Sequence, residues 1–176
     1  MVFFLLLLTG FGIENFLSTC KQFSVAGFFM IKERLYPYLL VFIQFSCLVF
    51  IAVSGPVFAK GMNGIFIESA GVFLAVLAIF TMKPGNFNIT PRIKQNGILV
   101  TSGPYRLIRH PMYLAQIIAV LPLVVDYFSW YRLAAILLLT VDLLVKIVYE
   151  EKKLNSHFKG YAGYSQKTKK LIPGLY

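Results

Sequence analysis

The sequence predicts an all-α, polytopic membrane protein with about five transmembrane helices, and three observations lead to this class. Apolar residues make up 58% of the 176 residues and charged residues 14%, whereas about a quarter of a typical soluble domain is charged. The mean hydropathy is +0.73. The apolar residues gather in runs of roughly 20, the helix length that crosses a bilayer core about 30 Å thick.

The first three expected helices lie in the amino-terminal half. Residues 2–20 form the weakest span because they carry Glu14 and Asn15. A cleaved signal peptide is the alternative for this segment, although no basic residues precede its apolar run. Residues 35–55 and 64–82 each supply about 20 nearly uncharged positions, and we expect both to cross the membrane.

The last two expected helices differ in length. Residues 111–125 reach only about 22 Å at 1.5 Å per residue, so this short fourth helix does not cross the hydrocarbon alone. Residues 127–149 reach about 34 Å and cross with some tilt. A polar tail over 150–176 follows, and we expect it to be cytoplasmic and to cap a cofactor cleft.

The basic residues set the orientation. With five helices, nearly all Lys and Arg fall on the side of the 83–110 loop and the carboxy-terminal tail, and only Lys60 and Arg132 lie in the opposite loops. Cytoplasmic loops carry such an excess, so we expect the loop and the tail to face the cytoplasm, at the inner membrane if the source is bacterial.

The formal net charge of +10 does not indicate nucleic-acid binding, because the basic residues are not gathered on one polar face. Cys20 and Cys47 lie in apolar surroundings without ligand spacing, so we expect no metal site. We expect one integral membrane domain over 1–176, with amino-terminal helices in 1–82 and the chemistry in 83–176.

The first candidate site segment is GILVTSGPYRLIRHPMY, residues 97–113. Gly103-Pro104 indicates a turn, and Pro111 suits the first position of the fourth helix, where its missing N–H is not needed. Arg109 and His110 then lie at the positive end of that helix, which favours a carboxylate or phosphate. A basic anchor at the membrane boundary is the alternative interpretation.

The second candidate segment begins in the fifth helix, where Asp142, Lys146 and Glu150 recur every four residues. This spacing places them on one helix face and leads ionisable groups into the bilayer, where an unpaired charge costs on the order of 3 kcal/mol. Either the three residues face a polar site, or they form ion pairs that only neutralise one another.

At these residues the chain resembles the isoprenylcysteine carboxyl methyltransferase family, which is similar in turn to membrane phospholipid methyltransferases. The resemblance covers roughly residues 88–173. It rests on LVTSGPYRLIRHPMY, an interval of 36 residues, and then Glu150-Glu151, Leu154, Phe158, Tyr161, Tyr164 and Ile172-Pro173.

The resemblance implies S-adenosylmethionine as the methyl donor, S-adenosylhomocysteine as the product, and a lipidic or prenylated small molecule as the acceptor among the membrane lipids. By position in the family motif, cofactor contact is carried over to Gly97, Ile98, Leu99, Val100, Tyr105, His110, Pro111, Met112, Tyr113 and Glu150. The expected catalytic residues are Lys146, Glu150 and Glu151, and the expected substrate-binding residues are Lys146 and Asp142.

Lys146 lies where the family has a substrate-contacting arginine. Lysine keeps the positive charge but lacks the planar fork that binds a carboxylate twice. A prenylcysteine-type carboxylate would need only positioning by Lys146, because it is already ionised at neutral pH. An amine acceptor would need a base such as Glu150 or Glu151.

Two other functions stay open at this point. A small membrane partner or transport protein would keep the fold without turnover, and the motif also has a looser similarity to sterol reductases, which would imply a nicotinamide cofactor. Tyr161, Tyr164 and Phe158 either close over the donor or belong to an aromatic belt at the interface. The sequence leaves the oligomeric state open.

Overall fold

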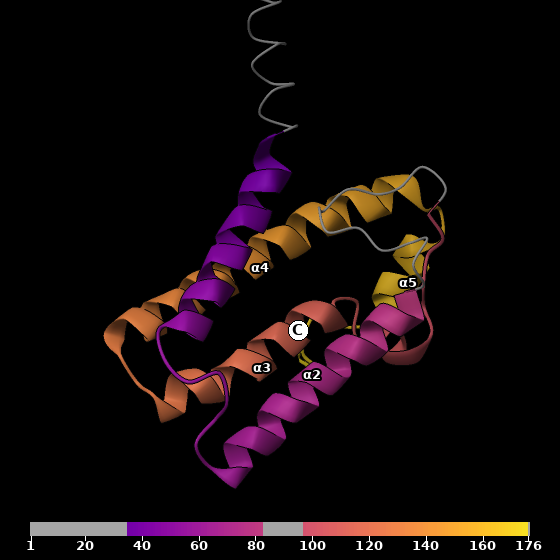
Figure 1. Ribbon diagram of the computed structural model, residues 1–176. Coiled ribbons are helices and arrows are strands. Elements are labelled where there is room, and N and C mark those ends of the chain that lie inside the picture. The colour runs from indigo at the N-terminus through magenta and orange to yellow at the C-terminus, as the bar shows by residue number, and fades with distance from the viewer. Residues whose placement is uncertain (1–34, 83–96, 176) are drawn as a thin grey trace, which may run out of the picture. The chain divides into compact units, whose positions relative to one another are not determined.

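The computed structural model describes residues 35–82 and 97–175, so the expected span over residues 2–20 lies outside the described residues. The described elements are the helix Leu35–Val53, α2 (Met62–Met82), the 3-10 turn η1 (Gly103–Arg106), α3 (Pro111–Asp126), α4 (Trp130–His157) and α5 (Tyr161–Lys167) (Figure 1). Extended pairing within the described ranges is limited to one parallel bridge between Ile108 and Lys169. The predicted all-α class is confirmed for this part of the chain.

Within the described ranges, two helices are long and apolar enough to cross a membrane: Leu35–Val53 and α2. They match the spans predicted at 35–55 and 64–82. Helix α3 has 16 residues and begins at Pro111, so the predicted short helix is confirmed as well. Leu40–Tyr176 forms one compact unit, and the site described below lies within it.

Helix α4 is longer than the sequence analysis predicted. It begins at Trp130 and ends at His157, so the first eight residues of the expected polar tail continue the helix. Glu and Lys, which are frequent after Tyr149, are good helix formers, and no Gly or Pro lies between Trp130 and Gly160. Glu150 and Glu151 therefore lie on the same rigid helix as Lys146.

Helices α2 and α3 lie side by side because small residues face each other across their contact (Figure 1). Gly71 approaches the α3 backbone so closely that a Cβ there would lie 2.6 Å from the Ala119 nitrogen and 3.0 Å from the Ala115 oxygen. Close backbone approach at small residues is the usual way in which membrane helices pack.

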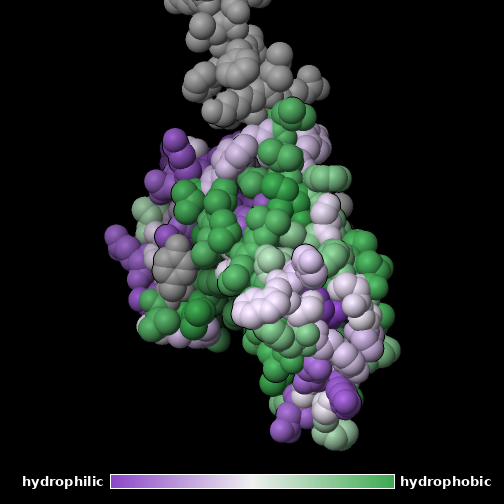
Figure 2. All heavy atoms as spheres, turned by 90° about the vertical axis from the view of Figure 1, so that its left-hand side faces the viewer, coloured by the Kyte–Doolittle hydropathy of each residue, from purple (hydrophilic) through white to green (hydrophobic). Residues whose placement is uncertain are grey.

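Most of the α2 surface is exposed and apolar, including Phe66, Phe73 and Phe80. Figure 2 shows apolar side chains over a large share of the face in view. Exposed apolar surface of this extent suits contact with lipid rather than water.

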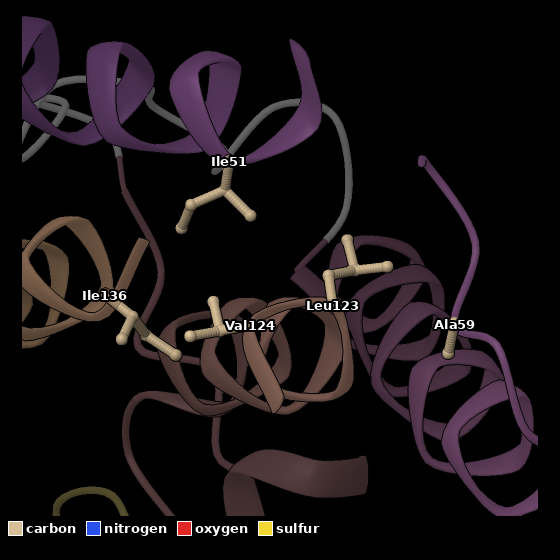
Figure 3. Close-up of a cluster of buried hydrophobic side chains, with 5 residues drawn as sticks. All are labelled: Ile51, Ala59, Leu123, Val124 and Ile136. Atoms are coloured by element: carbon tan, nitrogen blue, oxygen red, sulfur yellow. The ribbon is translucent and has the colours of Figure 1, made fainter. Parts of the chain in front are cut away.

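Two apolar clusters fill the space between the helices. Figure 3 shows the first cluster, in which Ile51 of the helix Leu35–Val53 lies near Leu123 and Val124 of α3 and Ile136 of α4. Ala59, in the loop between the helix Leu35–Val53 and α2, belongs to the same cluster. The second cluster contains Cys47, Leu139 and Leu143. Cys47 is buried and free, in agreement with the apolar surroundings that its sequence context indicates.

Arg132, which we counted with the loops, is buried at the start of α4. Its guanidinium donates to the Ser54 hydroxyl at 2.9 Å and to the Leu123 carbonyl at 3.0 Å. These hydrogen bonds connect α4 with α3 and with the end of the helix Leu35–Val53. The residue therefore joins three segments.

We expect Gly71→Val to lower the free energy of unfolding by about 1 to 3 kcal/mol, because the added side chain must displace the α3 backbone. Thermal unfolding in detergent would measure the change. Gly61→Ala is the matched control, since a Cβ at Gly61 meets nothing within 4 Å. Equal unfolding temperatures for the two variants would contradict the close contact between α2 and α3.

Candidate functional site

The loop before α3 is fixed at both ends. Gly103 has a φ of +57°, which favours glycine, and a Cβ there would lie 2.8 Å from the Thr81 hydroxyl at the end of α2. His110 is the N-cap of α3, and Pro111 begins the helix. The motif loop therefore presents Arg109 and His110 at a defined helix end, as the sequence predicted.

His110 faces both glutamates of α4. Its Nδ1 lies 3.5 Å from Glu150 Oε2, and its Nε2 lies 3.6 Å from Glu151 Oε1. The Tyr113 hydroxyl donates to Glu150 at 2.5 Å, and the His110 and Tyr113 rings stack in parallel with centroids 5.5 Å apart. The structure thus brings the two candidate segments into direct contact.

Arg109 fastens the carboxy-terminal segment to the same cluster. Its Nε donates to Glu151 at 2.7 Å, and its Nη1 donates to the Ser165 carbonyl at 2.9 Å and to the Thr168 carbonyl. The backbone N–H groups of Arg109 and His110 donate to the carbonyls of Lys169 and Lys170. Arg109 is therefore a buried residue that links the loop, α4 and the tail by hydrogen bonds. It is not a basic anchor at the membrane boundary.

The aromatic residues of the tail pack against the motif loop. The Tyr164 hydroxyl donates to the Tyr105 carbonyl at 2.6 Å, and Tyr161 is buried. Tyr105 is buried too, and its hydroxyl has no hydrogen-bond partner in the described part of the chain. Burial raises the pKa of Tyr105, so this hydroxyl remains a protonated donor at neutral pH.

The cluster of Arg109, His110, Glu150 and Glu151 favours the charged forms of His110 and Glu151. Burial lowers the pKa of His110, but the hydrogen bonds and negative charges of Glu150 and Glu151 outweigh it, and the pKa rises above its ordinary value of 6.5. Burial raises the pKa of Glu151, but the hydrogen bonds and positive charges of His110 and Arg109 lower it to about 2. The site therefore favours an imidazolium that faces two carboxylates.

A second polar group lies deeper along α4. Lys146 is 1% exposed, and its Nζ donates to Gln44 Oε1. It lies 5.5 Å from the centroid of the Tyr113 ring. Asp142 is 4% exposed, and neither carboxylate oxygen has a hydrogen-bond partner among the described residues.

The ion-pair series Asp142, Lys146, Glu150 is not formed. Within the described ranges, Lys146 makes no ion pair with either carboxylate at 4.0 Å or less, although each lies four residues away on the same helix. The self-neutralising alternative is therefore wrong in its simple form. A glutamine from another helix holds the ammonium instead.

The remaining predicted contact residues lie on both sides of the turn. Residues 97–100 run without regular structure into η1, with Ile98 76% exposed and Gly97, Leu99 and Val100 half-buried. In α3, Pro111 is buried and Met112 is half-buried. Their role as cofactor contacts stays a prediction.

The sequence analysis missed Gln44 and Thr168. Gln44 is 6% exposed and lies in the predicted span 35–55, where a lone amide among apolar residues was the available signal. Thr168 is buried, and its carbonyl and hydroxyl both accept from Arg109. Nothing in its sequence context distinguishes it from other tail residues.

Comparison with known proteins gives one family match. The model described as the isoprenylcysteine carboxyl methyltransferase (ICMT) family matches residues 64–156, which run from α2 nearly to the end of α4. The curated cobalt-zinc-cadmium resistance protein CzcN of Cupriavidus metallidurans is 36% identical over 84 residues. These residues are 47% of this chain, and the chain covers only 38% of that protein. No solved structure matches the chain.

We expect the charged cluster to make stability depend on pH. A raised folded-state pKa means that His110 stabilises the fold fully below its unfolded value of about 6.5, and that this contribution is lost as pH rises through the folded value. Glu151, with its lowered pKa, contributes above about 4.5 and loses this contribution only as pH falls toward 2.

The unfolding temperature should therefore fall as pH rises above about 6.5, and His110→Gln should flatten that slope. His157→Gln serves as the control because His157 is exposed. Parallel curves for the wild type and His110→Gln would contradict a charged His110 in the folded state.

Proposed function

The chain belongs to the isoprenylcysteine carboxyl methyltransferase family, a family of membrane methyltransferases, and from this premise we propose that it transfers a methyl group from S-adenosylmethionine to a lipidic acceptor. One observation carries the proposal: His110 at the start of α3 lies against Glu150 and Glu151 of α4. Two segments that are distant in the sequence thus place a positively charged side chain within 4 Å of two negatively charged side chains.

The chemistry of this cluster suits the amino-acid part of S-adenosylmethionine. Glu150 retains 22% side-chain exposure and can accept from an ammonium group. The imidazolium of His110 and the buried hydroxyl of Tyr105 can donate to a carboxylate. Leu99, Val100 and Met112 offer apolar surface for the adenine. Bound S-adenosylmethionine would supply an electrophilic methyl group on its sulfonium sulfur, and the protein's task is to align two reactants and exclude water.

The acceptor would lie deeper, at Lys146. An acceptor carboxylate needs no proton removed, so Lys146 has only to hold it in line with the methyl group. Bound S-adenosylmethionine would supply the methyl carbon for the ester and would depart as the thioether S-adenosylhomocysteine, while Lys146 would only orient the acceptor oxygen. We propose that the short α3 helix leaves room for a lipid tail to enter from the membrane, with Asp142 beside the acceptor, while the donor arrives from the cytoplasm.

The similarity to the cobalt-zinc-cadmium resistance protein supports a second candidate. In that role the chain would be a non-catalytic membrane partner in metal resistance that retains the fold. Binding of S-adenosylhomocysteine distinguishes the candidates, because a non-catalytic partner does not require it.

We expect the purified protein to bind S-adenosylhomocysteine in isothermal titration and Glu150→Gln to weaken binding by about tenfold or more, since a charge-assisted hydrogen bond contributes about 1.5 to 3 kcal/mol. Glu68→Gln is the matched control, because in the described part of the chain Glu68 accepts only from the Ala59 backbone N–H, toward the amino-terminal end of α2. Absence of saturable heat in the wild type would favour the non-catalytic candidate. Equal affinity in the wild type and Glu150→Gln would remove Glu150 from the donor site.

We expect Lys146→Met to impair acceptor use while leaving S-adenosylhomocysteine affinity within about twofold, because Lys146 lies one turn deeper than Glu150. Transfer of a labelled methyl group to N-acetyl-S-farnesylcysteine, and to a lipid extract of the expression host, measures acceptor use. Base treatment separates the products, since a methyl ester releases methanol and an N-methyl group does not. A loss of donor binding equal to that of Glu150→Gln would contradict this division of roles.

A further inference from the structure

Three helices meet at a buried relay of side-chain hydrogen bonds. Lys146 Nζ on α4 donates to Gln44 Oε1 on the helix Leu35–Val53, and Gln44 Nε2 donates to Gln116 Oε1 on α3 at 2.6 Å. Lys146 and Gln44 are both buried. Gln44 and its helix lie outside the residues that match the family model.

Chemistry fixes the direction of this relay. An ammonium group only donates, so the atom of Gln44 that faces Lys146 must be the amide oxygen. The amide nitrogen of Gln44 then faces Gln116, whose oxygen must accept from it. Gln116 therefore keeps the Gln44 amide in the one orientation that can hold a lysine.

The neighbouring carboxylate indicates what this arrangement achieves. Asp142 precedes Lys146 by one turn of α4, and opposite charges at that spacing normally pair. An unpaired carboxylate at membrane depth costs on the order of 3 kcal/mol, so pairing is strongly favoured. Both Asp142 oxygens nevertheless lack a hydrogen-bond partner among the described residues, while Lys146 turns to Gln44.

We propose that Gln44 is a positioning residue of the acceptor site, whose amide oxygen holds the Lys146 ammonium away from Asp142. This inference rests on the proposed function, which places Lys146 at the acceptor. One N–H group of Lys146 is bound to Gln44, and among the described residues the other two have no acceptor, so they can serve the acceptor substrate. Because an amide is neutral, it orients the ammonium without cancelling its charge.

The test is a compensation experiment on acceptor use by the full-length protein. In Gln44→Leu, Lys146 is released and pairs with Asp142, so the half-saturating concentration of N-acetyl-S-farnesylcysteine or of the lipid extract should rise about tenfold or more. S-adenosylhomocysteine affinity should stay within about twofold. Thr140→Val is the control, because the Thr140 hydroxyl donates only to a carbonyl of its own helix.

Adding Asp142→Asn to Gln44→Leu should restore acceptor use to within about threefold of the Asp142→Asn single variant, since no carboxylate then competes for Lys146. A purely structural role for Gln44 predicts a further loss in the double variant, and that result would overturn the inference. Gln44→Glu covers the case in which Gln44→Leu does not fold. It should still hold Lys146 but cancel its charge, so unchanged acceptor use in Gln44→Glu would also overturn the inference.

Nitrogen NMR of the lysine side chains keeps this inference separable from the proposed function. The Lys146 ammonium signal, assigned by its loss in Lys146→Met, should shift in Gln44→Leu and shift again when Asp142→Asn is added. An unchanged signal in Gln44→Leu would refute the positioning role, whether or not the protein transfers methyl groups. If the signal shifts but the wild type transfers no methyl group, the proposed function is refuted. The hydrogen bond from Lys146 to Gln44 would then still be supported.

Discussion

The cost of burying charge is the constraint on which the rest of the structure depends. Arg109 and His110 are largely withdrawn from water, and so are Glu150 and Glu151. Buried charges are tolerated only when they are paired and hydrogen-bonded. The loop before α3 and the end of α4 must therefore meet, because each carries the charges that the other needs. That single requirement brings together residues about 40 positions apart in the chain.

The same constraint explains the carboxy-terminal segment. Arg109 has more donors than Glu151 can accept, and the remaining ones bind the carbonyls of Ser165 and Thr168. The tail consequently follows the loop closely enough for Tyr164 to reach the Tyr105 carbonyl. Tyr161 and Tyr164 pack against the loop in this way, and their closure over the donor stays a prediction.

Polar groups are stabilised differently at different depths. At Glu150 and Glu151 of α4, opposite charges pair with one another, whereas one turn earlier on the helix a neutral amide holds Lys146. Still earlier on α4, Leu139 and Leu143 pack with Cys47 in an apolar cluster. Among the described residues, Lys146 donates to Gln44 and lies over the Tyr113 ring, so this buried cation keeps N–H groups without a hydrogen-bond acceptor. A buried cation with unused donors is an expected feature of a functional site in a membrane protein.

The sequence by itself predicted the all-α class, the spans at 35–55 and 64–82 and the short helix from Pro111, because hydrophobic length and local turn chemistry act over neighbouring residues. The pairing of the RHPMY and EE segments was implied by the resemblance to the family. Only the tertiary structure decided that α4 continues to His157 and that Arg109 binds the tail. It also decided that Lys146 donates to Gln44 and not to Asp142. The spacing on α4 alone favours the pair Asp142 and Lys146. The hydrogen-bond partner of Lys146 depends instead on how the helix Leu35–Val53 packs against α4. That packing cannot be predicted from the residue spacing within α4.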